Sequence, residues 1–128
     1  MKTKQLIISV LLAALALTIS GCVVAAVGAG AAAGVGYIRG DLEATLENDV
    51  EQVYEASLKA LDQLKLAVIS KQQDALAAKI VSRNSEDKKI QVNLKQIEGS
   101  VTKLTIRIGV FGDETQSRLI YDKIRENL

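Results

Sequence analysis

Apolar and polar residues recur along the chain with the two periods that are typical of strands and helices. Residues 41–47 alternate between polar and apolar side chains, which predicts a half-buried strand. From Val50 to about Lys65 the apolar residues recur every three or four positions, which predicts an amphipathic helix. Asn48 stands three residues before Glu51, and this is the spacing of a capping box. We therefore expect Asn48 to cap the helix.

The next forty residues have the alternation of an antiparallel sheet. The predicted strands are residues 66–71, 78–81, 89–95 and 103–108. Polar residues at 84–87 and 98–100 supply turns between them. Whether residues 66–83 form one strand or two stays open. Each strand is apolar on one side only, which predicts a sheet with a single covered face.

A second helix ends the predicted domain. Asp113 and Gln116 have the spacing of an N-cap and its partner, and an apolar stripe that ends at Leu128 follows them. We expect residues 109–113 to be a structural junction in which glycine permits the turn and Phe111 packs against the core. The fold class is α+β: an antiparallel sheet of four or five strands with two helices on one face, in the order β-α-β-β-β-β-α. The predicted core contains Leu46, Val50, Leu61, Ile80, Val92, Ile106, Ile108 and Ile124.

The amino terminus has the pattern of a secretory signal. Lys2 and Lys4 precede an apolar run over residues 6–17, and small residues follow it up to Cys22, the only cysteine. This arrangement resembles the lipobox of bacterial lipoproteins, in which the thiol is diacylated, the signal is removed and the new amino terminus is acylated. The alternative, a buried cysteine at the end of an ordinary apolar helix, leaves the lysines and the small residues unexplained.

Residues 22–36 form an uncharged segment of Gly, Ala and Val. We interpret it as a tether, flexible or helical, that follows the lipidated cysteine. Gly30 and Gly34 have GxxxG spacing, so a helix–helix contact is the alternative interpretation. The predicted organisation is a signal peptide over residues 1–21, a lipidated tether over 22–36 and a periplasmic α+β domain over 37–128.

Composition excludes several classes of function. Without residues 1–21 the chain carries 14 basic and 15 acidic residues, which argues against a nucleic-acid binder. Histidine and tryptophan are absent, and there is no second cysteine, so we expect no metal site of the usual kind, no cofactor and no Cys-His or Ser-His pair. Ser85 and Lys88 match the S-x-x-K spacing of serine acyl-enzymes, but they lie in a predicted turn. We expect no enzymatic activity.

Six cations share the polar face of the predicted sheet. They are Lys79, Arg83, Lys89, Lys95, Lys103 and Arg107. If the first strand joins the sheet, Asp41, Glu43 and Glu47 project from the same side. One interpretation is an ordinary solvated surface of mixed charge. The other is a surface that accepts anions, such as lipid headgroups, lipopolysaccharide phosphates or an acidic protein.

Several short motifs together resemble a known family. They are the run from Arg107 to Glu114, the residues Ser117, Arg118, Tyr121 and Ile124 after it, Tyr37-x-x-Gly40-x-Leu42, and the pairs Val53-Tyr54 and Ala60-Leu61. With the lipobox they resemble small bacterial lipoproteins grouped as domain of unknown function 3568. The resemblance implies a periplasmic, lipid-anchored α+β domain, and it implies no activity, substrate or catalytic residue.

Two hypotheses about function follow. The first is a structural or interaction module that docks an envelope protein through its sheet. The second is a module that binds a small apolar ligand or anionic lipid. Val23 follows the predicted lipid site where lipoprotein sorting rules place aspartate for inner-membrane retention. By that resemblance we expect the chain at the periplasmic face of the outer membrane.

Overall fold

The computed structural model describes residues 2–8 and 34–128. Residues 2–8 are helical, and Gly34–Leu128 form a separate compact unit. The predicted lipid site at Cys22 and most of the predicted tether lie outside the described residues. Within these two ranges, no helix has both the length and the apolar character that crossing a membrane requires.

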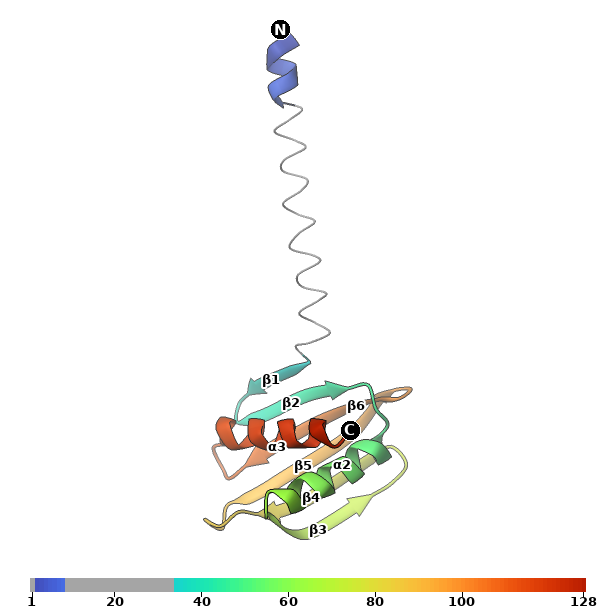
Figure 1. The fold of residues 1–128 in the computed structure, drawn as a ribbon, viewed down its shortest axis with the longest axis vertical. Coiled ribbons are helices and arrows are strands. Elements are labelled where there is room, and N and C mark those ends of the chain that lie inside the picture. The colour runs from blue at the N-terminus through green and yellow to red at the C-terminus, as the bar shows by residue number, and fades with distance from the viewer. Residues whose placement is uncertain (1, 9–33) are drawn as a thin grey trace. The chain divides into compact units, whose positions relative to one another are not determined.

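A six-stranded antiparallel sheet forms the centre of the domain (Figure 1). Its strands are β1 (Val35–Ile38), β2 (Asp41–Leu46), β3 (Ala67–Gln73), β4 (Ala77–Arg83), β5 (Lys89–Glu98) and β6 (Val101–Ile108). Their order across the sheet is β1-β2-β6-β5-β4-β3, so the first hairpin lies beside the last strand. The α+β class is confirmed.

The sheet has six strands where four or five were predicted. The two-strand alternative for residues 66–83 is the correct one and accounts for five, and β1 is the sixth. Residues 66–83 form two strands rather than one, because Asp74 accepts hydrogen bonds from the backbone N–H groups of Leu76 and Ala77 and so closes a turn. In addition, β1 begins two residues inside the segment that we predicted to be tether. This strand is short and contains Gly36, so its sequence has no alternation that separates it from the Gly/Ala-rich run before it.

Both helices of the domain cover the same face of the sheet (Figure 1). They are α2 (Val50–Gln63) and α3 (Glu114–Glu126). Between helices and sheet lies one cluster of buried apolar residues, and it includes all eight members of the predicted core. The predicted faces of β2, β4, β5 and β6 are therefore confirmed, because Leu42, Ile80, Val92 and Ile106 are each fully buried. Strand β3 differs, since all of its residues are exposed.

One of the two predicted helix caps is wrong by one residue. The N-cap of α2 is Asp49, whose side chain accepts a hydrogen bond from the backbone N–H of Gln52 at 2.8 Å. Asn48 instead presents its backbone oxygen to the hydroxyl of Thr102, which fixes the start of α2 to β6. The cap of α3 is confirmed, since Asp113 accepts a hydrogen bond from Gln116 N at 3.0 Å.

Candidate functional site

The face of the sheet opposite the helices is uncovered, and we call it the open face. The structure places all six predicted cations on it, because each alternates along its strand with buried residues. Arg83 lies opposite Lys89 across β4 and β5, and Lys95 lies opposite Lys103 across β5 and β6. Like charges therefore face one another at two positions of the sheet.

Three of the six cations are paired with carboxylates. Lys103 Nζ lies 3.0 Å from a Glu43 oxygen, and Arg107 Nη1 lies 2.8 Å from Asp41 Oδ1. Arg83 is paired with Asp87 at 3.2 Å. Exposed pairs of this kind contribute at most about 1 kcal/mol each to stability, but they offset the charge of Arg83 in β4 and of both β6 cations.

The other three cations on the open face have no such partner. Lys79, Lys89 and Lys95 form no ion pair with any described residue. They belong to β4 and β5, so the unpaired positive charge lies over two neighbouring interior strands of the sheet. Glu47, which we expected beside Asp41 and Glu43, comes after the end of β2 and is exposed.

At one end of the sheet, two turns pack backbone against backbone. The loop of residues 109–113 joins β6 to α3, and the turn at Arg39-Gly40 joins β1 to β2. Gly112 has a φ of 82°, and a Cβ there would lie 2.5 Å from Gly40 Cα and still closer to Gly40 O and the Tyr37 hydroxyl. Gly40 itself has a φ of 90°, and its Cβ would meet Phe111 O at 2.7 Å. Only glycine fits this approach.

Arg107 holds the same two turns together through its guanidinium. Nη1 donates to Asp41 Oδ1 at 2.8 Å and to Arg39 O at 3.2 Å, and Nη2 donates to Val110 O at 2.5 Å. The backbone N–H of Gly109 also donates to Lys89 O at 2.8 Å, which ties the loop to the start of β5. Arg107 is thus engaged by acceptors of its own chain, although the sequence analysis placed it among the anion-binding residues.

The side chains at the tip of this loop point into solvent. Phe111 is 91% exposed and Val110 is 77% exposed, so the prediction that Phe111 packs against the core is wrong. The last buried residue of β6 is Ile108, and the loop starts beyond the part of the sheet that the helices cover. No core position remains there for the phenylalanine ring.

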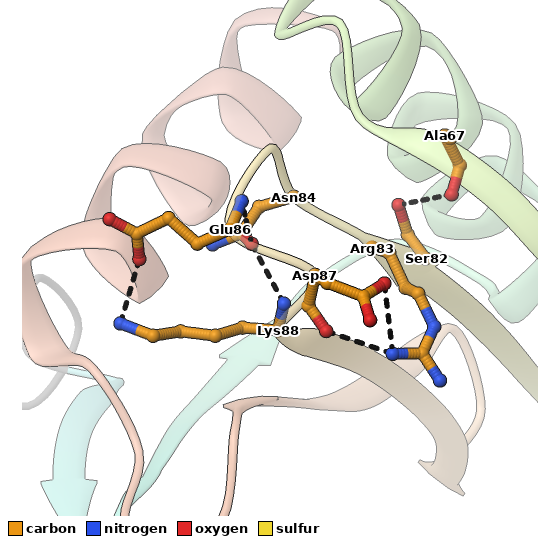
Figure 2. Close-up of polar contacts among 7 residues, drawn as sticks. All are labelled: Ala67, Ser82, Arg83, Asn84, Glu86, Asp87 and Lys88. Carbon is orange, nitrogen blue, oxygen red and sulfur yellow. Dashed lines mark hydrogen bonds and ion pairs between the residues drawn. The ribbon is translucent and has the colours of Figure 1, made fainter.

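A second turn, residues 84–88, faces the loop across an open hollow. Asn84 Oδ1 accepts hydrogen bonds from the backbone N–H groups of Glu86 and Lys88, at 3.0 and 2.9 Å (Figure 2). Lys88 Nζ is paired with Glu86 at 2.8 Å, and that carboxylate raises the pKa of Lys88 by accepting its hydrogen bond and attracting its charge. Asn84 Nδ2 also donates to Gln116 on α3 at 3.2 Å. The turn is therefore held by hydrogen bonds within itself and by one to α3.

We call the space between the loop of residues 109–113 and the turn of residues 84–88 the loop hollow. It has a volume of about 720 Å³. Its charged lining residues are Arg83, Asp87, Lys88, Lys89, Arg107 and Asp113, and its apolar wall is Val110 and Phe111. Several of these residues could be assigned to the polar face from the sequence, but the hollow could not, because only the fold brings residues 83–91 to residues 107–113.

Two further hollows lie elsewhere on the domain surface. One, of about 670 Å³, lies by the β3–β4 turn and includes Leu76 and Lys95. The other, of about 470 Å³, lies where the start of α2 meets the end of α3 and includes Glu55 and Leu128. None of the three lies between the sheet and the helices. The described ranges also contain no group of three or more Cys, Asp or Glu side chains that could hold a metal ion.

A comparison with protein families identified the family of the chain. The model of a family described as Protein of unknown function (DUF3568) matches residues 5–127. A search of curated proteins found nothing similar to the chain. Several residues that carried the family resemblance in the sequence, among them Tyr37, Gly40, Arg107 and Gly112, meet where the two turns pack together.

Proposed function

Since the chain belongs to the family described as Protein of unknown function (DUF3568), we propose a function from its own residues: it is a lipid-anchored protein of the cell envelope whose domain binds another protein. The observation that carries the second half of this proposal is the open face. Strands β2, β4, β5 and β6 present polar and charged side chains on a surface that no helix covers, while the other face is occupied by the core. A surface of this kind is available to a partner without any unfolding.

The anchor is proposed from the amino-terminal sequence. Lysines, an apolar run of signal-peptide length and the single Cys22 after Ser20-Gly21 together support a lipoprotein signal. Acyl chains on Cys22 would contribute about 0.8 kcal/mol for each buried CH₂, so three chains hold the protein on a membrane permanently. Val23 supports a position on the periplasmic face of the outer membrane.

Metabolic labelling tests the anchor. Radiolabelled palmitate should enter the wild-type chain and the Ser20→Ala control, but not Cys22→Ser. Val23→Asp should move the labelled chain from the outer-membrane to the inner-membrane fraction. Label that persists in Cys22→Ser would show that the cysteine is not the lipid site.

Site-specific photocrosslinking in intact cells tests protein binding. The crosslinker is placed at Thr105, which lies between Glu43 and Asn93 in the middle of the open face. The control position is Leu119, which is 54% exposed on α3. We expect a discrete adduct with one protein from Thr105 and none from Leu119. Equal adduct patterns from both positions, or none from either, would refute the proposal.

A second candidate function is binding to an anionic lipid surface, and the unpaired Lys79, Lys89 and Lys95 favour it. Their charges are free to attract phosphates, and such attraction weakens as salt rises because the Debye length is only about 8–10 Å at 0.10–0.15 M salt. The triple change of these lysines to glutamine should abolish flotation with anionic vesicles. A matched triple change of Lys59, Lys65 and Lys71, which are exposed but lie off this face, should leave flotation intact. Equal flotation by both variants would show that Lys79, Lys89 and Lys95 do not bind the anionic lipid surface and are ordinary solvated side chains.

A further inference from the structure

Phe111 is the only phenylalanine of the chain, and the structure holds it in solvent on a loop that is fixed from several sides. Arg107 binds the loop carbonyl of Val110, Gly112 packs on Gly40, and Asp113 begins α3. A mobile loop would lose more conformational entropy when it binds. Exposed aromatic side chains on preorganised backbone are the anchors that contribute most to protein interfaces.

We propose that the loop hollow binds an acidic peptide segment of a partner protein, with an apolar side chain of that segment packed on Val110 and Phe111. This inference rests on the proposed function, and it names the place and the chemistry of the contact. The volume of about 720 Å³ lies within the usual range for binding pockets, which is about 300–1,000 Å³. A few residues of an extended segment fill such a space.

The charge of the lining selects for an acidic occupant. Four cations and two carboxylates line the hollow. Arg83 and Arg107 are already offset by Asp87 and Asp41, but Lys89 has no ion pair among the described residues. Lys88 is likewise offset, because its Nζ lies 2.8 Å from a Glu86 oxygen. A carboxylate of the peptide beside Lys89 therefore gains an ion pair that the free protein lacks.

The geometry favours a peptide over a membrane surface. The cations lie between two turns, so an extended chain can enter where a flat bilayer surface cannot. The hollow also lies at the end of the sheet remote from Gly34, where the domain begins. Gly34 accepts a hydrogen bond from Thr45 near the end of β2, whereas Gly40 at the other end of β1 contacts the loop. Gly34 and the hollow thus lie at opposite ends of the β1–β2 hairpin.

Fluorescence anisotropy with defined peptide pools tests the proposal. The probes are fluorescein-labelled hexapeptides that alternate Asp or Glu with Leu, Ile, Val or Phe, and a matched pool with Lys or Arg in the charged positions. The protein is the full-length chain in neutral detergent. We expect the acidic pool to bind at least tenfold more tightly than the basic pool, and Phe111→Ser and Lys89→Glu each to weaken it at least tenfold.

Matched variants at the other end of the sheet are the controls. Ile97→Ser removes an apolar side chain that is 57% exposed, and Lys95→Glu reverses an unpaired cation of the same face. Neither should change binding by more than twofold, and unchanged urea midpoints show that all four variants are folded. The proposal is overturned if the two pools bind equally or if the controls weaken binding as much as the test variants. It is also overturned if Phe111→Ser weakens only the binding of anionic vesicles.

These results separate the hollow from the wider function. Adducts from Thr105 in cells together with no peptide binding in the hollow would refute this inference and leave the proposed function standing. If no adduct forms from Thr105 in intact cells, the proposed function itself is refuted.

Discussion

Replacing Gly112 with alanine tests the backbone contact between the β6–α3 loop and the β1–β2 turn. Gly109→Ala is the matched control, because both glycines belong to one loop and have similar positive φ angles, 82° and 67°. A Cβ on Gly109 would meet nothing within 4 Å, whereas a Cβ on Gly112 would lie 2.5 Å from Gly40 Cα and closer to two oxygens. The two substitutions therefore share the conformational cost and differ in the steric one.

The expected magnitudes follow from these two terms. A left-handed backbone costs an alanine about 1–2 kcal/mol relative to glycine, and this term applies to both variants. At Gly112 the neighbouring turn must also move by roughly 1 Å, and overpacking of this kind costs about 1–3 kcal/mol. We expect a loss of about 1–2 kcal/mol in the free energy of unfolding for Gly109→Ala and about 2–5 kcal/mol for Gly112→Ala.

Urea unfolding followed by far-ultraviolet circular dichroism measures both values. The slope of the free energy against urea should stay unchanged, since neither variant alters the surface exposed on unfolding. Two alanine variants that agree within about 0.5 kcal/mol, well under the steric term, would refute the close approach of the two turns.

Three further predictions concern packing, capping and charge. Ile106→Ala should lower the free energy of unfolding by about 2–5 kcal/mol, measured by urea unfolding, because Ile106 is fully buried and the change leaves a cavity. A loss of only a few tenths of a kcal/mol would contradict that packing. Asp113→Ala should cost about 1 kcal/mol through loss of the cap while leaving the location of the protein unchanged, which fractionation can check. The pKa of Lys88, titrated by NMR, should lie above 10.5 and fall toward it in Glu86→Gln. Because this folded-state pKa is raised, the stabilising effect of the pair is complete below pH 10.5 and is lost as the pH rises through the pKa of Lys88; a pKa unaffected by Glu86→Gln would exclude the pair as its cause.

The strand faces could be predicted from the sequence because the sheet is covered on one side only. Buried residues such as Val92 and Ile106 alternate with polar ones, and this period survives in any arrangement of the strands. The same reasoning failed for β1, where Gly36 and a length of four residues leave no period to detect. The cap of α2 was placed one residue early because Asn48 and Asp49 both have side chains that can cap a helix.

For the candidate site, the sequence predicts which cations share a face of the sheet but not which of them are paired with carboxylates. Alternation identified the cations that share the open face, yet it could not show that β2 lies beside β6. That neighbour brings Asp41 to Arg107 and Glu43 to Lys103, so it decides which cations are offset. The exposure of Phe111 was equally hidden, because it depends on how Gly112 packs against a turn more than seventy residues earlier in the sequence.

The position of the β1–β2 hairpin also affects the order in which the chain can fold. This hairpin is joined to the sheet only through β6, and the hydrogen bond between Asp41 and Arg107 spans 66 residues. A two-stranded hairpin is marginally stable by itself, and pairing over such a separation is slow. During synthesis from the amino terminus, β2 therefore has no partner strand on the side of β6 until residues 101–108 have been made. Until then Leu42, Ala44 and Leu46 are not covered as they are in the folded domain. Chains that stop before β6 leave these apolar side chains and an unpaired strand edge exposed, and they are the form most prone to aggregate or to require a chaperone.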